Sequence, residues 1–243
     1  MIQISLQNIR QIFIRDFNLC FFVSLCILSL YPEPAKKLNL DPELVYMVLP
    51  VYNGLFTALI SLFLNRYFAG KNYTRRYYVS DKKALSIVAF IAGFLSIYIT
   101  FAPASTYLIS LIIIYIAYLS VKDFAAKLSS MLTPDTLATP QDIGEFANFF
   151  INLTITFAVI NLSLNTIHGS FKIQQAFDFG DGVAGIIDAL YFSIITMTTV
   201  GYGDIVPHTV IARIIVAFEC LTSYLMFGIM IGIITRGISF NKK

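Results

Sequence analysis

Main-chain oxygens in one short segment could bind a monovalent cation that has lost its water shell. Residues 199–203 read Thr-Val-Gly-Tyr-Gly. The carbonyls of the first four residues could supply several oxygens at once, in stacked rings. They can face one axis only if the backbone alternates between ordinary and positive φ, which Gly201 and Gly203 accept without a Cβ clash. We therefore predict an ion-binding site at Thr199, Val200, Gly201, Tyr202 and Gly203. The alternative is a Gly-rich turn in a membrane protein.

The composition indicates an integral membrane protein. Hydrophobic residues make up 57% of the 243 residues and charged residues only 13%, whereas charged residues are about 25% of a typical soluble domain. The basic residues lie between hydrophobic runs, so we expect no nucleic-acid partner. The chain has no nucleophile–base set, phosphate loop or metal cluster. We therefore predict no enzyme activity, no cofactor and no small-molecule substrate.

The hydrophobic runs predict an all-α fold with six transmembrane helices. The segment 185–198 is apolar but too short to span, so we predict a re-entrant pore helix that ends at the ion-binding loop. Thr139, Pro140 and Asp142 together are typical of a helix start. The six predicted spans are 17–31, 44–68, 84–102, 104–121, 145–167 and a last span from Pro207 to about residue 238.

The distribution of Lys and Arg predicts the orientation of these spans. Thirteen of these residues fall on one side of the six predicted spans and four on the other. Cytoplasmic loops carry the excess of Lys and Arg, so both termini should be cytoplasmic and the loop at 199–203 should lie near the outer surface of the cell membrane. Basic and tyrosine residues alternate in 66–83, which could hold anionic lipid headgroups; a plain topogenic loop is the alternative.

Residues 189–207 resemble the pore of bacterial potassium channels, and the pair Ala212-Arg213 is also similar to that family. Six spans with one pore segment resemble the bacterial six-helix channels beside the voltage-gated superfamily. The resemblance implies a homotetrameric potassium channel with K⁺ bound by the carbonyls of Thr199, Val200, Gly201 and Tyr202. It also implies that the last helix lines the cavity. The alternatives are a non-conducting or regulatory subunit and a K⁺ transporter component.

The resemblance divides the chain into four parts, in which residues 1–121 correspond to a four-helix sensor domain. Voltage sensing needs several Arg or Lys residues that move through the membrane field. The fourth predicted span has none, so we expect no steep voltage dependence. We also expect no cytoplasmic regulatory domain after the last span. The other three predicted parts are a cytoplasmic interfacial linker at 122–145, a pore domain at 146–238 and a short tail at 239–243.

The surroundings of the predicted filter depart from the family pattern. Ile195 stands where the family often has a glutamate behind the filter. Tyr191 occupies the place of an aromatic donor, so we expect it to donate a hydrogen bond to Asp204; simple packing is the alternative. The resemblance places Thr198 at the inner end of the filter. Tyr191, Thr198 and Asp204 are therefore the predicted supports of the filter.

Four residues of the last helix are candidates for gating. Glu219 is a carboxyl group deep in the predicted span, which is costly and so suggests a function. The carboxyl group could be protonated, or it could be hydrogen-bonded to a Thr or Ser behind the filter. We favour a structural or gating role over direct ion binding. Ser223 stands at the place of the family's glycine hinge. Gly228 and Gly232 lie on one face of the last helix. They could form a bending point or allow close helix packing.

Polar residues of the predicted outer loops have two possible roles. His208 lies just past the predicted filter and could confer proton sensitivity, or it could be an exposed histidine without a role. Arg213 could meet Asp178, Asp181 or Asp188 of the acidic outer loop.

Overall fold

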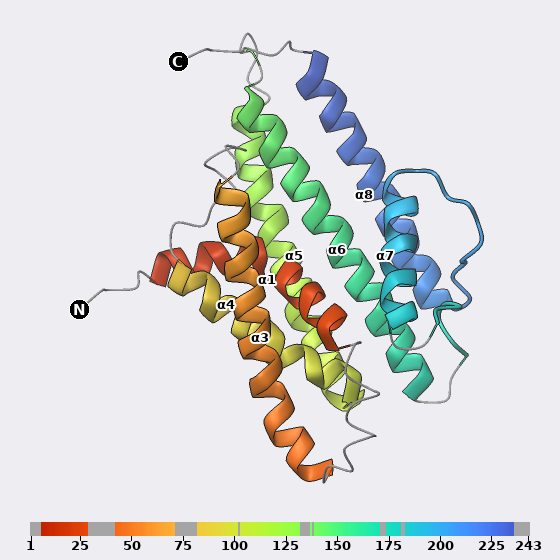
Figure 1. Ribbon diagram of the computed structural model, residues 1–243. Helices are drawn as coiled ribbons and strands as arrows, with labels where there is room; N and C mark the ends of the chain where they lie inside the picture. Colours follow the sequence, from red (N-terminus) through yellow and green to blue (C-terminus); the bar gives the residue numbers. More distant parts are fainter. Residues whose placement is uncertain are drawn as a thin grey trace. The chain divides into compact units, whose positions relative to one another are not determined.

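The described residues of the computed structural model are 6–28, 42–70, 82–101, 103–131, 137, 139–170, 174–180 and 183–235. Every regular element within these ranges is a helix, which confirms the predicted all-α class. In chain order (Figure 1), the helices are α1 Leu6–Leu28, α3 Pro42–Gly70, α4 Lys82–Phe101, α5 Pro103–Met131, α6 Pro140–Ser170, α7 Val183–Met197 and α8 Val210–Thr235.

Within the part of the chain that the structure describes, four helices are long and apolar enough to cross a membrane. Their apolar segments are Val48–Arg66, Leu108–Ala126, Asp142–Gly169 and Val210–Thr235. Shorter apolar segments lie at Asp16–Ile27 in α1 and Ala184–Met197 in α7. Four of the predicted spans thus have a counterpart of sufficient length. At the predicted span 17–31 the described apolar segment is shorter, Asp16–Ile27. The predicted span 84–102 overlaps α4, a helix of 20 residues, and a total of six spans stays a prediction.

The end of α5 and the start of α6 both lie within the predicted linker at 122–145. α5 continues without a break through residue 121 to Met131, because no Gly or Pro follows Pro103 within it. α6 begins at Pro140 and is capped as predicted. The Thr139 amide donates to the Asp142 carboxylate at 2.8 Å, and the Asp142 amide donates back to the Thr139 hydroxyl at 3.3 Å. This reciprocal pair satisfies free amides at the helix start.

The chain forms two compact units, one of residues 1–116 with 180–186 and the other of 117–179 with 187–243. In the first unit, α1, α3 and α4 pack against one another. Buried Asn53 links all three helices, because its amide donates to the hydroxyl of Ser24 at 2.7 Å and to the carbonyl of Gly93 at 2.9 Å. α3 and α4 approach closely at Gly93, where an added Cβ would lie 2.8 Å from the Cα of Gly54.

In the second unit, two apolar clusters surround the end of the chain that carries the predicted filter. One cluster consists of the buried residues Phe124, Phe146, Leu153, Met197, Met226 and Ile233. The other consists of Ala176, Phe177, Phe179, Ala189, Phe192 and Ala212. The first cluster contains the last residue of α7, Met197, and the second contains Ala189 and Phe192 from its middle, so the loop that follows α7 starts from a packed helix end.

Replacing Gly93 by Ala should destabilise the first unit. The new methyl group would lie 2.7 Å from the Thr57 hydroxyl and 2.8 Å from a backbone atom of Gly54, and overpacking of this kind costs about 1–3 kcal/mol. We expect a lower midpoint of thermal unfolding for the detergent-solubilised protein. Gly169→Ala is the matched control, because its Cβ would meet nothing within 4 Å. An unchanged midpoint in Gly93→Ala would contradict the close approach of α3 and α4.

Candidate ion-binding site

The predicted filter begins where α7 ends. The amide of Thr199 donates to the carbonyl of Thr196 at 3.0 Å. The amides of Val200 and Gly201 both donate to the carbonyl of Ile195, at 2.9 and 3.1 Å. The last turn of a helix leaves carbonyls without a partner inside the helix. Here the amides of the following loop satisfy them, and this fixes the loop to the helix end.

These hydrogen bonds determine the direction of the neighbouring carbonyls. The N–H and C=O of a trans peptide point to opposite sides of the peptide bond, and the described residues contain no cis peptide. Because the amide of Val200 points at α7, the carbonyl of Thr199 points away from it. The amide of Gly201 orients the carbonyl of Val200 in the same way. Two successive oxygens are therefore free to face a ligand on the side away from α7.

Positive φ occurs at three alternate positions of the loop. Gly201 has φ 51° and Gly203 has φ 78°, as the sequence predicts. Thr199 also has a positive φ, of 60°, which the sequence does not predict. A left-handed conformation costs a residue with a Cβ about 1–2 kcal/mol. Strained residues of this kind cluster at functional sites, and no feature of the residue type indicates it in advance.

The predicted hydrogen bond between Tyr191 and Asp204 is present. The phenol of Tyr191 on α7 donates to the carboxylate of Asp204 at 2.7 Å. This bond lowers the pKa of Asp204 below its usual value. It joins α7 to the segment just after the predicted filter. The amides of Val200 and Gly201 join α7 to the beginning of the filter. Both ends of the loop are thus attached to one helix.

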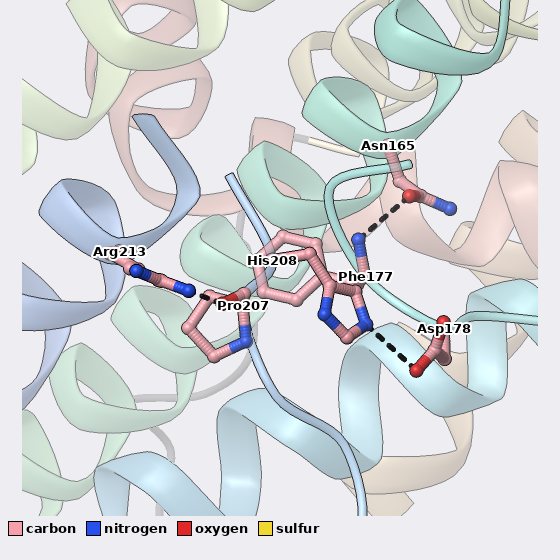
Figure 2. Close-up of polar contacts among 6 residues, drawn as sticks. All are labelled: Asn165, Phe177, Asp178, Pro207, His208 and Arg213. Carbon is pink, nitrogen blue, oxygen red and sulfur yellow. Dashed lines mark hydrogen bonds and ion pairs between the residues drawn. The ribbon is translucent and has the colours of Figure 1, made fainter. Parts of the chain in front are cut away.

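The segment after the loop is attached to residues 174–180 (Figure 2). The amide of His208 donates to the carbonyl of Ala176 at 2.9 Å, and the imidazole contacts the carboxylate of Asp178 at 2.8 Å. The Asn165 side chain accepts a bond from the Phe177 amide at 3.0 Å. Sequence reasoning considered Arg213 as a partner for Asp178, but Asp178 pairs with His208.

Arg213 makes a different contact at the start of α8. Its Nε donates to the carbonyl of Pro207 at 3.2 Å (Figure 2). The contact fixes the turn that leads from the loop into α8.

Glu219 and Ser223 both reach α7 from α8. The Ser223 hydroxyl donates to the carbonyl of Met197, the last residue of α7. Glu219 is fully buried and accepts a hydrogen bond from the amide of Asn161 at 3.0 Å. The Ser193 hydroxyl accepts a hydrogen bond from the same Asn161 amide at 3.2 Å, so Asn161 links Ser193 to the carboxyl group. Asn161 on α6 was missed, because a single Asn in an apolar run carries no signal of its own.

The other predicted residues of the site remain close to their own helices. Thr198 donates its hydroxyl to the carbonyl of Ile194 at 2.7 Å, one turn back in the chain. α8 continues as a helix through Gly228 and Gly232. A Cβ at Gly228 would meet nothing within 4 Å, so close packing within this chain does not require a glycine at that position.

Comparison with known proteins points to the same part of the chain. Residues 149–239 match a family model described as an ion channel. Two-pore potassium channel 1 of Arabidopsis thaliana is 34% identical over 37% of this chain and 24% of its own length. The voltage-gated potassium channel of Aeropyrum pernix is 34% identical over 30% of this chain and 25% of its own. The comparisons support a potassium channel.

The similarity to these relatives covers only part of each protein. The chain spans about a quarter of the length of these two relatives. The relatives include plant two-pore channels, so the narrower resemblance to bacterial six-helix channels stays a prediction. No solved structure matches the chain. The matching family is an ion channel, which is not a class of enzyme, and together with the four long apolar helices it supports a multi-pass membrane protein.

Replacing Tyr191 by Phe should raise the pKa of Asp204 toward its ordinary value. The phenol stabilises the charged carboxylate, so its contribution is present at neutral pH and is lost as the pH falls through the lowered pKa of Asp204. The titration can be followed by the carboxyl ¹³C shift of labelled aspartate. Tyr224→Phe removes an exposed phenol from α8 and should change nothing. An Asp204 pKa that is equal in wild type and Tyr191→Phe would exclude the proposed contact.

Proposed function

We propose that this chain is a subunit of a potassium-selective channel that conducts K⁺ passively across the membrane. K⁺ is dehydrated and coordinated by the main-chain carbonyls of Thr199, Val200, Gly201 and Tyr202. One observation carries the proposal: the amides of the Thr-Val-Gly-Tyr-Gly segment are bound to the end of α7, which turns the adjoining carbonyls away from that helix. The match of residues 149–239 to an ion-channel family supports it.

The electrostatics of α7 favour a cation at this place. The C-terminal end of a helix carries a partial negative charge equivalent to about half an electron. α7 ends at Met197, and its last turn contains no basic residue that would offset this charge. A cation next to the loop would be stabilised by this helix end as well as by its direct oxygen ligands.

We propose that four copies of the chain form the pore. One chain contributes one filter segment, and a ring of carbonyls needs several such segments around a common axis, which cyclic symmetry provides. The side chains of Val200 and Tyr202 are 52% and 72% exposed in a single chain. Exposed apolar side chains beside the proposed ion path would be more stable if neighbouring copies of the chain buried them. α8, which is largely unburied along its length, would line the cavity.

The proposed topology has six spans, with both termini in the cytoplasm and the filter near the outer surface of the cell membrane. In this arrangement residues 1–121 form a sensor-like domain without a series of arginines, 122–145 a linker, 146–238 the pore domain and 239–243 the tail. Membrane lipids surround the assembly.

The function can be tested by recording from purified protein in planar bilayers with K⁺ on one side and Na⁺ on the other. We expect a reversal potential far from zero, on the side that marks K⁺ selectivity. Gly201→Ala should abolish selective current, because φ of 51° strains any residue with a Cβ. Gly169→Ala, in open space at the end of α6, should behave as the wild type. Reversal at zero in the wild type would overturn the proposal.

The channel should show only a shallow dependence on voltage. Each charge that crosses the field contributes about 2.3 kcal/mol per 100 mV, and the apolar segment of α5 from Leu108 to Val121 contains no Arg or Lys. We expect a conductance that changes gradually between strongly negative and strongly positive potentials. A steep sigmoid conductance–voltage curve would contradict the proposed lack of a charged sensor.

A further inference from the structure

A buried polar cluster lies between α6, α7 and α8, away from the proposed ligands of K⁺. It consists of Asn161, Ser193 and Glu219, and each of these residues is 0% exposed. The two hydrogens of the Asn161 amide both find partners here, the Ser193 hydroxyl at 3.2 Å and a Glu219 carboxyl oxygen at 3.0 Å. One amide therefore links three helices.

A second contact joins the same two faces of α7 and α8. Ser223 donates to the carbonyl of Met197. Ser193 and Met197 are four residues apart on α7, as are Glu219 and Ser223 on α8, so each pair lies on one helix face. The two contacts are one helical turn apart, and the second involves Met197, the residue directly before Thr198.

We propose that these two contacts, which we call the polar lock, hold the C-terminal half of α7 and, through it, the loop at 198–203. Glu219 and Ser223 are thus positioning residues. This inference rests on the proposed function, for which it names the link between the inner helix and the filter. A rotation of α8 at Glu219 and Ser223 would displace Met197 and with it the Ile195 carbonyl that binds the amides of Val200 and Gly201.

The chemistry of the cluster favours a functional role over simple packing. Apolar side chains would fill this space without a desolvation penalty, whereas polar groups inside a membrane helix are costly and usually functional. Among the described residues, Asn161 Oδ1 and Glu219 Oε1 have no hydrogen-bond partner. The Asn161 amide, which donates to the Glu219 carboxyl group, is uncharged, so a hydrogen bond rather than an ion pair joins these two helices.

Hydrogen exchange of the full chain in lipid nanodiscs tests the polar lock. The readout is the exchange rate of the amides of Val200 and Gly201, which are protected only while they contact the end of α7. Glu219→Leu leaves the Asn161 amide without one of its two acceptors, which should speed this exchange about tenfold. Glu219→Gln keeps an oxygen acceptor in the same place and should restore a rate close to that of the wild type.

Three further variants keep the test decisive. Ser223→Ala should speed the same exchange, because it removes the second contact, between Ser223 and Met197. Ser163→Ala is the matched control, since this buried hydroxyl donates to the carbonyl of Val159 in its own helix, and it should leave the rate unchanged. If Glu219→Leu does not assemble, Asn161→Leu with Glu219→Leu removes donor and acceptor together, and it should assemble with fast exchange.

The outcomes separate the polar lock from the channel itself. Equal exchange rates in wild type, Glu219→Leu and Ser223→Ala would overturn the lock, even if the wild type conducts K⁺. Rates in Glu219→Gln as fast as in Glu219→Leu would also overturn it, because a charge and not a hydrogen bond would then be required. A wild type that shows the expected exchange pattern but no K⁺-selective current would instead overturn the proposed function.

Discussion

The contact between the loop amides and the end of α7 is the constraint on which the candidate site depends. Val200 and Gly201 donate to one carbonyl, that of Ile195. This contact satisfies the helix end and directs the adjoining carbonyls away from it. A flexible loop would lose these directions, because carbonyls coordinate a dehydrated ion only when they are held in place. The main chain rather than any side chain thus defines the proposed ligands.

Several further contacts of the second unit restrain α7 or the segments that adjoin it. Tyr191 attaches α7 to Asp204, just beyond the loop. His208 attaches the following segment to Ala176 and Asp178. On the other side, α8 attaches to the last residue of α7 through Ser223. The strain at Thr199 can persist because these contacts fix the backbone on both sides of it.

The sequence predicts the local chemistry better than the contacts between helices. The positive φ values of Gly201 and Gly203 follow from residue types, and the resemblance to potassium-channel pores adds the Tyr191–Asp204 bond. The roles of Asn161 and of the pair His208–Asp178 do not, since each depends on segments far apart in the chain that meet only after folding. The positive φ of Thr199 was missed for another reason: a β-branched residue gives no local signal for it. Helix lengths were partly predictable, since hydropathy identifies apolar runs but does not show where α5 ends.

The central claim, that main-chain carbonyls of this loop bind K⁺, can be tested directly by NMR. The protein would be labelled with ¹³C at the carbonyls of Thr199 and Val200 and studied in lipid with K⁺ or with Na⁺. Carbonyls that coordinate K⁺ should change their chemical shift when K⁺ replaces Na⁺, while a labelled carbonyl in the middle of α6, such as that of Val159, should not. Identical spectra of Thr199 and Val200 in the two ions would contradict the account.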